Sequence, residues 1–467
     1  MDKISLHPID YIIILIYLIL TLFIGLHYSG KKNQNNPENF LLAGRKLSLP
    51  AFTATLVSTW YGGILGIGEF TWLYGILNWV VQALPYYIFA IIFALFFAPK
   101  IQKTRLFTIP DLIYKEYGKK SGVIASILIF FLVTPAPHLL MVMFLLSGVL
   151  GIHLIVAYAI SVVFSILYVY IGGFKAVVKT DILQFVLMFT GFIVLTYILI
   201  TQYGGINFLQ KNLPSTHLEF SGGMGIPYVL VWFFIALWTF VDPGFYQRCY
   251  AAKSPKTAKF GILAAVGFWL VFDLLTTTAG FYSKVLLPEI NPVMAFPKLG
   301  ELAMPPFFLG IFIVGLLATI MSTLDSTAFL SAVTFGRDII WRIKGKDKIG
   351  KYTRIGLVVS VVFSTLLVIV LPSVVTMWYT LGSLLIPALL LPVLSTLFNQ
   401  TKYFNDKQMF ISMITGFLGA LTWFVLGAGF GTWENPQYFM EIQPFYVGLL
   451  MNISILTIGV LKNKYTS

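Results

Sequence analysis

Residues 51–74 read AFTATLVSTWYGGILGIGEFTWLY, a mostly apolar run with four glycines near its middle, at positions 62, 63, 66 and 68. A helix that crosses a bilayer needs about 20 such residues. Glycine weakens helices, and within lipid an interrupted backbone survives only beside a cavity that protein lines. Glycines also let membrane helices pack closely. The run therefore leaves two interpretations open, a broken helix beside a binding site or a tight helix contact.

The rest of the chain has the same apolar character. Of its 467 residues, 58% are hydrophobic and only 10% are charged, against about 25% charged in an average soluble domain. This composition excludes a soluble enzyme, a disordered protein and an ordinary nucleic-acid-binding protein. The single cysteine, Cys249, excludes a disulfide framework, a multi-thiolate zinc site and a ligated iron–sulfur cluster. We therefore expect an integral membrane protein whose surroundings are lipid.

The chain contains thirteen mostly apolar runs of about 20 residues, which predict an all-α fold with about thirteen transmembrane helices. The first run is not a cleaved signal peptide, because it is long, carries Asp10 at its start and lacks a small-residue cleavage site. The connections are too short for a soluble domain, so residues 1–467 are expected to form a single transmembrane domain. The predicted spans lie near residues 8–27, 51–74, 79–98, 121–150, 154–173, 181–202, 228–246, 258–282, 306–336, 353–371, 376–397, 408–428 and 443–461.

The distribution of lysine and arginine predicts the orientation. Of the 31 lysine and arginine residues, 27 fall in alternate connections between spans or at the C-terminal end, and so on one side of the membrane. The four on the opposite side are Lys3, Lys211, Lys284 and Lys298. Cytoplasmic loops carry such an excess of basic residues. We therefore expect a cell-membrane protein with its N-terminus outside and its C-terminus in the cytoplasm. The net charge of +13 reflects this bias rather than a nucleic-acid partner, and no obligate protein partner is evident.

The order of the spans suggests two structural repeats. If one helix leads, residues 51–202 and 228–397 form two five-helix units that enter the membrane from opposite faces, as inverted repeats must. Two helices at about 408–461 then follow. The first helix of each unit should be interrupted near the middle of the membrane. The glycines of the first unit and the sequence Asp242-Pro243-Gly244 in the second unit fit this prediction.

Residues 316–332, LLATIMSTLDSTAFLSA, carry hydroxyl groups on one helix face. Thr319, Ser322 and Thr323 are spaced i, i+3 and i+4 and so point the same way. A hard cation such as Na⁺ prefers oxygen ligands, which two hydroxyls and a carbonyl can supply. Hydroxyls in a membrane helix also commonly bond back to the preceding turn, and that simpler interpretation competes.

Acidic residues inside the spans are functional candidates, because a carboxylate in the membrane is costly. Asp325 follows the hydroxyl run, and Asp181 is expected either to cap the next helix or to offer a carboxylate to a cation. Glu69, Asp273 and His138 have no assigned role. His138 follows two prolines and is as consistent with packing at a kink as with a substrate or proton contact.

Residues 172–184 read GGFKAVVKTDILQ, residues 245–253 read FYQRCYAAK, and residues 321–326 read MSTLDS. Together these three strings resemble the sodium:solute symporter family, the relatives of sodium–glucose, sodium–proline, pantothenate and sialic-acid transporters. The first is similar to the family's GG-x-x-AV-x-x-TD-x-x-Q, the second to its QR-x-x-AAK and the third to its sodium motif. RLFTIPDLIYKEYG, at 105–118, is a weaker fourth match. The resemblance implies a LeuT-like 5+5 inverted-repeat bundle and a sodium site between the second and ninth spans.

Carried over by motif, that sodium site would use the carbonyls of Leu56, Thr59 and Thr319 and the hydroxyls of Ser322 and Thr323. Some relatives have a second site. Asp181 and Ser326 match its ligands, but Asp325 stands where a serine is expected, so a carboxylate ligand or a bound proton is equally open there. The positions that meet substrate in sugar-transporting relatives are Ser58, Gly63 and Asp242 here.

A sugar-type site is therefore not reproduced, and no arginine is predicted deep in a span. Trp60, Tyr61 and Phe245 could wall a small pocket, and the solute class stays open. The resemblance implies a secondary active transporter, not an enzyme, that imports a small organic solute with sodium by alternating access, without an organic cofactor. The alternatives are a proton-coupled carrier of the same fold, which Asp325, Asp242 and Glu69 would suit, or a membrane module that senses sodium or solute.

Overall fold

The computed structural model describes residues 3–27, 37–345, 349–398, 403–433 and 436–466. These residues form helices and their connections, apart from an isolated bridge between Leu47 and Ala252. In chain order the helices are α1 (Pro8–His27), α3 (Pro37–Leu42), α4 (Leu49–Trp60), α5 (Ile64–Tyr74), α6 (Leu77–Gln82), α7 (Leu84–Ile92), α8 (Ala98–Thr104), α9 (Ile109–Leu132), α10 (Ala136–Leu150), α11 (Leu154–Tyr203), α12 (Ile206–Asn212), α13 (Ile226–Ile235), α14 (Pro243–Ala251), α15 (Pro255–Leu286), α16 (Ala295–Ala303), α17 (Phe308–Val333), α18 (Arg342–Lys344), α19 (Ile349–Val370), α20 (Val374–Leu397), α21 (Asp406–Phe430) and α22 (Pro444–Thr466).

The helices agree with the predicted spans in number and approximate place. Within the described ranges, eleven helical stretches are long and apolar enough to cross a membrane. The remaining two predicted spans are also helical. One is divided between α4 and α5, and the other is the first part of α11, which kinks at Gly173, where φ is +63°. The all-α fold is confirmed.

Helix α9 begins twelve residues before the predicted span at residue 121, because Thr108 and Asp111 form a reciprocal capping box that starts the helix at Ile109. It kinks at Gly118, where φ is +83°, and the part that follows the kink begins close to the predicted start. The same span is also split, since α9 ends at Leu132 and α10 starts after Pro135.

Both predicted helix interruptions are present. The second span passes from α4 to α5 through a 3₁₀ turn, η2 (Tyr61–Gly63). The seventh span passes from α13 through a second 3₁₀ turn, η5 (Ala236–Phe240), to α14, which Asp242 caps at its N-terminus. A 3₁₀ turn replaces i→i+4 bonding by i→i+3 bonding and often marks a functional hinge.

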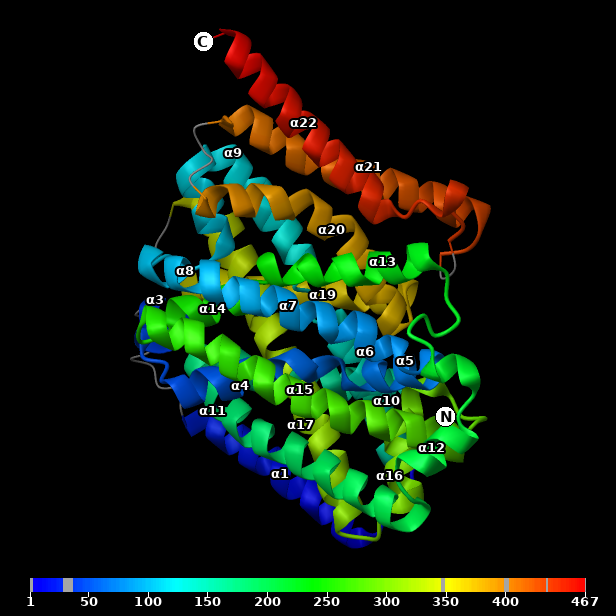
Figure 1. Ribbon diagram of the computed structural model, residues 1–467. Coiled ribbons are helices and arrows are strands. Elements are labelled where there is room, and N and C mark those ends of the chain that lie inside the picture. The colour runs from blue at the N-terminus through cyan, green and yellow to red at the C-terminus, as the bar shows by residue number, and fades with distance from the viewer. Residues whose placement is uncertain (1–2, 28–36, 346–348, 399–402, 434–435, 467) are drawn as a thin grey trace.

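The helices pack as a bundle whose interior holds both interrupted spans. Figure 1 shows α1 along one side and the α21–α22 pair along the other, with α4, α17 and α20 between them. α17 packs against α11 along much of its length and also contacts η2 and α4. The first span of one half thus lies directly against the hydroxyl-bearing helix of the other half.

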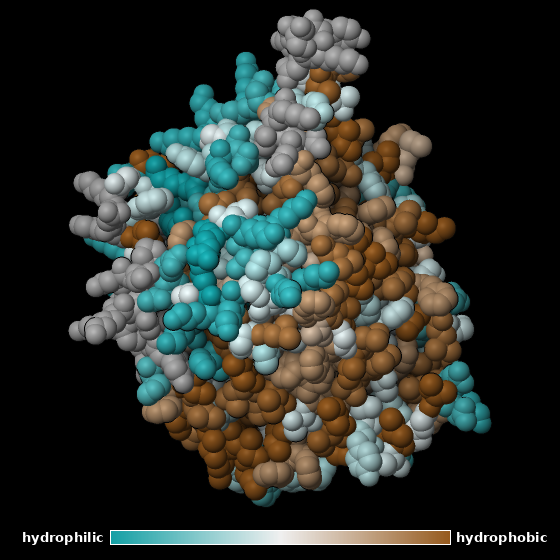
Figure 2. All heavy atoms as spheres, turned by 60° about the vertical axis from the view of Figure 1, so that its left-hand side comes forward, coloured by the Kyte–Doolittle hydropathy of each residue, from teal (hydrophilic) through white to brown (hydrophobic). Residues whose placement is uncertain are grey.

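The outer surface matches a membrane environment. Figure 2 shows broad hydrophobic areas beside a hydrophilic region on one side of the view. On α1, the side chains of Ile12, Leu15, Ile16, Ile19 and Phe23 are exposed. We call the end of the bundle at which Figure 1 shows α3, α8 and α14 the basic end, because Lys100, Lys103 and Arg105 lie in or directly after α8 and Lys253 closely follows α14. The opposite end, where α12 and α16 lie, is the far end. Of the four residues predicted to share one side, Lys211 lies in α12, Lys284 in the last turn of α15, and Lys298 in α16, where it donates to the carbonyl of Lys3.

Candidate cation and substrate site

A cavity of about 170 Å³ lies between the two interrupted spans. Its wall comes from η2, the α9–α10 junction, η5 and the middle of α17, and it extends toward the far end along α5, α13 and the start of α20. Of the side chains predicted to bind substrate, Trp60 and Asp242 line this cavity, together with Gly63.

Two other predicted substrate residues lie behind the cavity wall. Ser58 is fully buried in α4, and its hydroxyl donates to the carbonyl of Ala54 at 2.8 Å. Phe245 is buried in α14, and its ring packs edge-on against Trp60 at 6.0 Å between centroids. Neither is among the described residues that line the cavity. Phe245 therefore supports Trp60 from behind.

The interrupted second span meets α17 directly beside this cavity. The hydroxyl of Thr323 donates to the carbonyl of Thr59 at 2.5 Å. Gly62 makes this approach possible, because a Cβ atom there would lie 2.0 Å from the Cβ and Oγ1 of Thr323. The glycine is therefore required by packing, and two of the predicted sodium ligands are in contact across the interface.

The other predicted sodium ligands surround this contact. The hydroxyl of Ser322 lies 3.4 Å from Oγ1 of Thr59 and donates to a carboxylate oxygen of Asp181 at 2.6 Å. The hydroxyl of Thr319 donates to the carbonyl of Gly315 at 2.6 Å. The prediction uses the carbonyl of Thr319 as a ligand, and this hydrogen bond does not involve that carbonyl. Leu56 is buried in α4, one turn before the interruption.

Asp181 does not cap a helix. It lies well inside α11, beyond the kink at Gly173, and is fully buried. The helix resumes immediately after Gly173 rather than after a loop, so the residue predicted at a helix start faces the interior. Besides Ser322, the hydroxyl of Thr55 donates to its carboxylate. Asp181 thus joins α4, α11 and α17.

Arg248 is the most important site residue that sequence analysis misplaced. Arg248 lies just beyond the predicted seventh span, among the basic residues expected in the connections, but the structure buries it completely within α14. The helix resumes after the break at Asp242 and carries the guanidinium into the protein instead of out of it. Its Nη2 lies 3.7 Å from a carboxylate oxygen of Asp181 and donates to three hydroxyls, those of Thr59 at 2.6 Å, Thr55 at 3.0 Å and Ser326 at 3.2 Å.

The predicted second cation site is therefore built around an arginine. Asp181 and Ser326, two of its predicted ligands, both contact the Arg248 guanidinium. Asp325, the third, is fully buried on α17.

The acidic and basic residues without a predicted role fall into two groups. Asp273 and His138 line the cavity, and the hydroxyl of Tyr87 donates to the carboxylate of Asp273. Glu69 is partly buried on α5 and is not among the described lining residues. No local pattern in the sequence marks Asp273 as a cavity residue, because its position depends on how α15 packs against η2 and α7.

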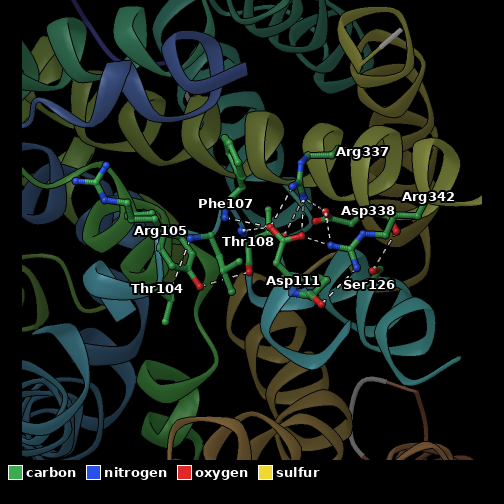
Figure 3. Close-up of polar contacts among 12 residues, drawn as sticks. Thr104, Arg105, Phe107, Thr108, Asp111, Ser126, Arg337, Asp338 and Arg342 are labelled. Atoms are coloured by element: carbon green, nitrogen blue, oxygen red, sulfur yellow. Dashed lines mark hydrogen bonds and ion pairs between the residues drawn. The ribbon is translucent and has the colours of Figure 1, made fainter. Parts of the chain in front are cut away.

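A cluster of ion pairs, shown in Figure 3, lies at the basic end. Asp111, at the start of α9, accepts bonds from the backbone N–H groups of Phe107 and Thr108 at 3.0 and 3.1 Å. Arg337 lies 3.1 Å from Asp111 and 2.5 Å from Asp338, and Arg342 also pairs with Asp111. These bonds join the segment that continues α17, namely η7 (Thr334–Trp341) and α18, to the start of α9.

Comparison with known proteins places the whole bundle among transporters. A family model described as the sodium:solute symporter family matches residues 40–416. Sodium/glucose cotransporter 4 of Danio rerio is 23% identical over an alignment that covers 96% of this chain and 77% of that protein. Sodium/proline symporter 2 of Staphylococcus saprophyticus is 25% identical, with 72% of this chain and 70% of that protein covered.

A solved structure supports the fold. A Na⁺-coupled sialic acid symporter, in a substrate-bound outward-open state, superposes with a TM-score of 0.81 at 17% identity, covering 98% of this chain and 97% of the other. At that identity the likeness concerns the fold alone. It confirms the LeuT-like fold.

Proposed function

Because the chain belongs to the sodium:solute symporter family, we propose that it imports a small organic solute together with Na⁺ by alternating access. The observation that carries this proposal is the contact between the Thr323 hydroxyl and the Thr59 carbonyl at 2.5 Å. It brings two oxygen ligands, one from each half of the molecule, to a single point beside the cavity. A cation bound there would stabilise the association of the two halves.

We propose that Na⁺ is held by the carbonyls of Leu56, Thr59 and Thr319 and the hydroxyls of Ser322 and Thr323. The set fits the ion because every donor is an oxygen, as a hard cation requires. All five residues belong to α4 and α17, which contact each other.

The position of Arg248 affects how many sodium ions the protein can transport with each solute molecule. Its guanidinium contacts Asp181 and Ser326, the residues that would otherwise serve a second cation. A buried carboxylate needs a compensating charge, and Arg248 supplies one permanently because arginine keeps its proton. We propose that the Arg248 guanidinium takes the place of a second Na⁺, so that the protein transports one Na⁺ with each solute molecule.

Alternating access requires that one end of the bundle be closed while the other is open. The ion-pair cluster of Asp111, Arg337, Asp338 and Arg342 holds the basic end together, while the cavity extends toward the far end. If the basic end is cytoplasmic, as its charge predicts, this arrangement corresponds to an outward-facing or occluded state.

Proteoliposome uptake separates sodium coupling from its main competitor. The alternative is proton coupling, which Asp242 and Asp273 in the cavity and the buried Asp325 favour. Uptake should require an inward Na⁺ gradient, stop when K⁺ replaces Na⁺, and vary little with external pH. Uptake in K⁺ that rises as the external pH falls would instead support the proton-coupled carrier.

A further inference from the structure

The composition of the cavity wall identifies a class of solute. We infer that the transported solute is a small organic ammonium ion, held by an aromatic wall and by the carboxylates of Asp242 and Asp273. This inference rests on the proposed transport function and specifies its substrate. Three features of the cavity support it: its aromatic side chains, its two acidic groups, and the absence of lysine and arginine among the described residues that line it.

Aromatic rings dominate the wall. Six lining residues are aromatic: Trp60, Tyr61, Tyr86, Trp232, Trp238 and Trp378. The faces of such rings attract organic cations, and tryptophan does so most strongly. Recognition of quaternary ammonium groups by several rings at once is an established use of this interaction.

The rings are held in place by their surroundings. Trp60 meets Tyr86 edge-on at 4.6 Å between centroids and is backed by Trp269 at 5.0 Å. Trp378, from α20, lies on the glycines of the interrupted span, since a Cβ at Gly63 would come within 2.2 Å of its ring. The aromatic wall thus follows the same interruption that forms the proposed sodium site, so cation and solute would lie close together.

Two carboxylates face the same space from different helices. Asp242 caps α14, its Oδ1 accepting the backbone N–H groups of Gly244 at 2.6 Å and Phe245 at 3.1 Å. Asp273, on α15, accepts the hydroxyl of Tyr87. All of these donors are neutral, so none of the contacts supplies a positive charge to either carboxylate.

Arg248 lies behind the wall and forms its ion pair with Asp181, while its Nη1 donates to the carbonyl of Gly244 at 3.2 Å. Its charge also acts on Asp242, but among the described residues it forms no ion pair with Asp242 or Asp273. Acidic groups in such a setting need a compensating charge. A cationic solute supplies it, whereas an anionic solute would be repelled and a neutral polyol would leave the charge uncompensated.

Binding to the purified, detergent-solubilised protein tests the inference without a sodium gradient. Thermal unfolding would be followed in Na⁺ with choline, tetramethylammonium, 3,3-dimethylbutan-1-ol and myo-inositol, because a ligand that binds the folded state raises its apparent stability. The alcohol has the shape of choline but no charge. We expect choline or tetramethylammonium to raise the melting temperature and the two neutral compounds to leave it unchanged.

Substitutions test which side chains bind the ammonium ion. Asp273→Asn and Trp60→Leu should each weaken ammonium binding about tenfold. Glu69→Gln, which removes a carboxylate outside the described lining, should leave it unchanged. The melting temperature of each variant without ligand shows whether it is folded, and binding by a folded Asp273→Asn at unchanged affinity would overturn the inference.

The outcomes distinguish the solute class from the transport function. Equal stabilisation by 3,3-dimethylbutan-1-ol and choline, stabilisation by myo-inositol, or no stabilisation by either ammonium ion would refute the ammonium assignment. None of these results bears on whether sodium drives transport. That function fails separately, if uptake of every solute that binds is the same in Na⁺ and in K⁺.

Discussion

Substitution of Gly62 by alanine tests the contact on which the proposed sodium site depends. The new Cβ would lie 2.0 Å from Thr323, whereas real Cβ contacts essentially never fall below 3.0 Å. The interrupted span and α17 must therefore separate by about 1 Å, which is several times the roughly 0.3 Å spread of oxygen distances around a bound hard cation. The Thr59–Thr323 contact, now 2.5 Å, would lengthen accordingly.

Overpacking of this kind costs about 1–3 kcal/mol. If that cost falls on the cation-bound form, the Na⁺ concentration for half-maximal uptake should rise by about 5-fold to 150-fold. The assay is initial uptake into proteoliposomes as a function of external Na⁺. Gly267→Ala is the matched control, because a Cβ at this position on α15 meets nothing within 4 Å. A Gly62→Ala protein with the wild-type activation curve would refute the reasoning.

Three further predictions follow from the site and the ends of the bundle. Arg248→Gln should lower the free energy of unfolding by about 3–5 kcal/mol, because it leaves the Asp181 carboxylate buried without its pair. Adding Asp181→Asn should recover most of that loss. Equal unfolding curves for Arg248→Gln and wild type would show that the ion pair does not stabilise the fold. Burial holds the pKa of His217, at the far end, below its ordinary value, so the unfolded chain binds more protons than the folded one at acidic pH. The stability is therefore full above the ordinary pKa of about 6.5 and is lost as the pH falls from there through the lower pKa of the folded state. His217→Gln should flatten that loss between pH 7 and 5 in thermal unfolding, and an unchanged slope would count against it. Asp111→Asn should loosen the basic end and speed maleimide labelling of the buried Cys249; labelling no faster than in wild type would show that the ion pairs do not close this end.

Much of the fold could be predicted because its signals are local. The length of each apolar run, the glycines at 62 and 63 and the sequence Asp242-Pro243-Gly244 depend only on neighbouring residues, and the structure has helices and interruptions at those places. The shared face of Ser322 and Thr323 follows from helical periodicity alone.

The misplaced residues depend on contacts between distant segments. Arg248 counts as a loop residue by composition, yet the helix that resumes after the interruption turns it inward, toward Asp181 of another helix. The cavity tryptophans at 238 and 378 have mainly apolar neighbours along the chain, so periodicity cannot separate a lining residue from a lipid-facing one. Asp181 was misplaced for a related reason, because the helix resumes at once after the kink at Gly173.

Sodium binding to Thr323→Val tests the central claim most directly. Valine keeps the shape of the side chain and removes only the hydroxyl that reaches the Thr59 carbonyl. Radioactive ²²Na⁺ binding to the purified protein at equilibrium, without solute or gradient, should saturate at one ion per chain in the wild type. The account predicts a Kd about 10-fold higher or more in Thr323→Val, since bonds to a charged group are worth about 1.5–3 kcal/mol. Equal Kd values for the two proteins, or no saturable binding by the wild type, would contradict it.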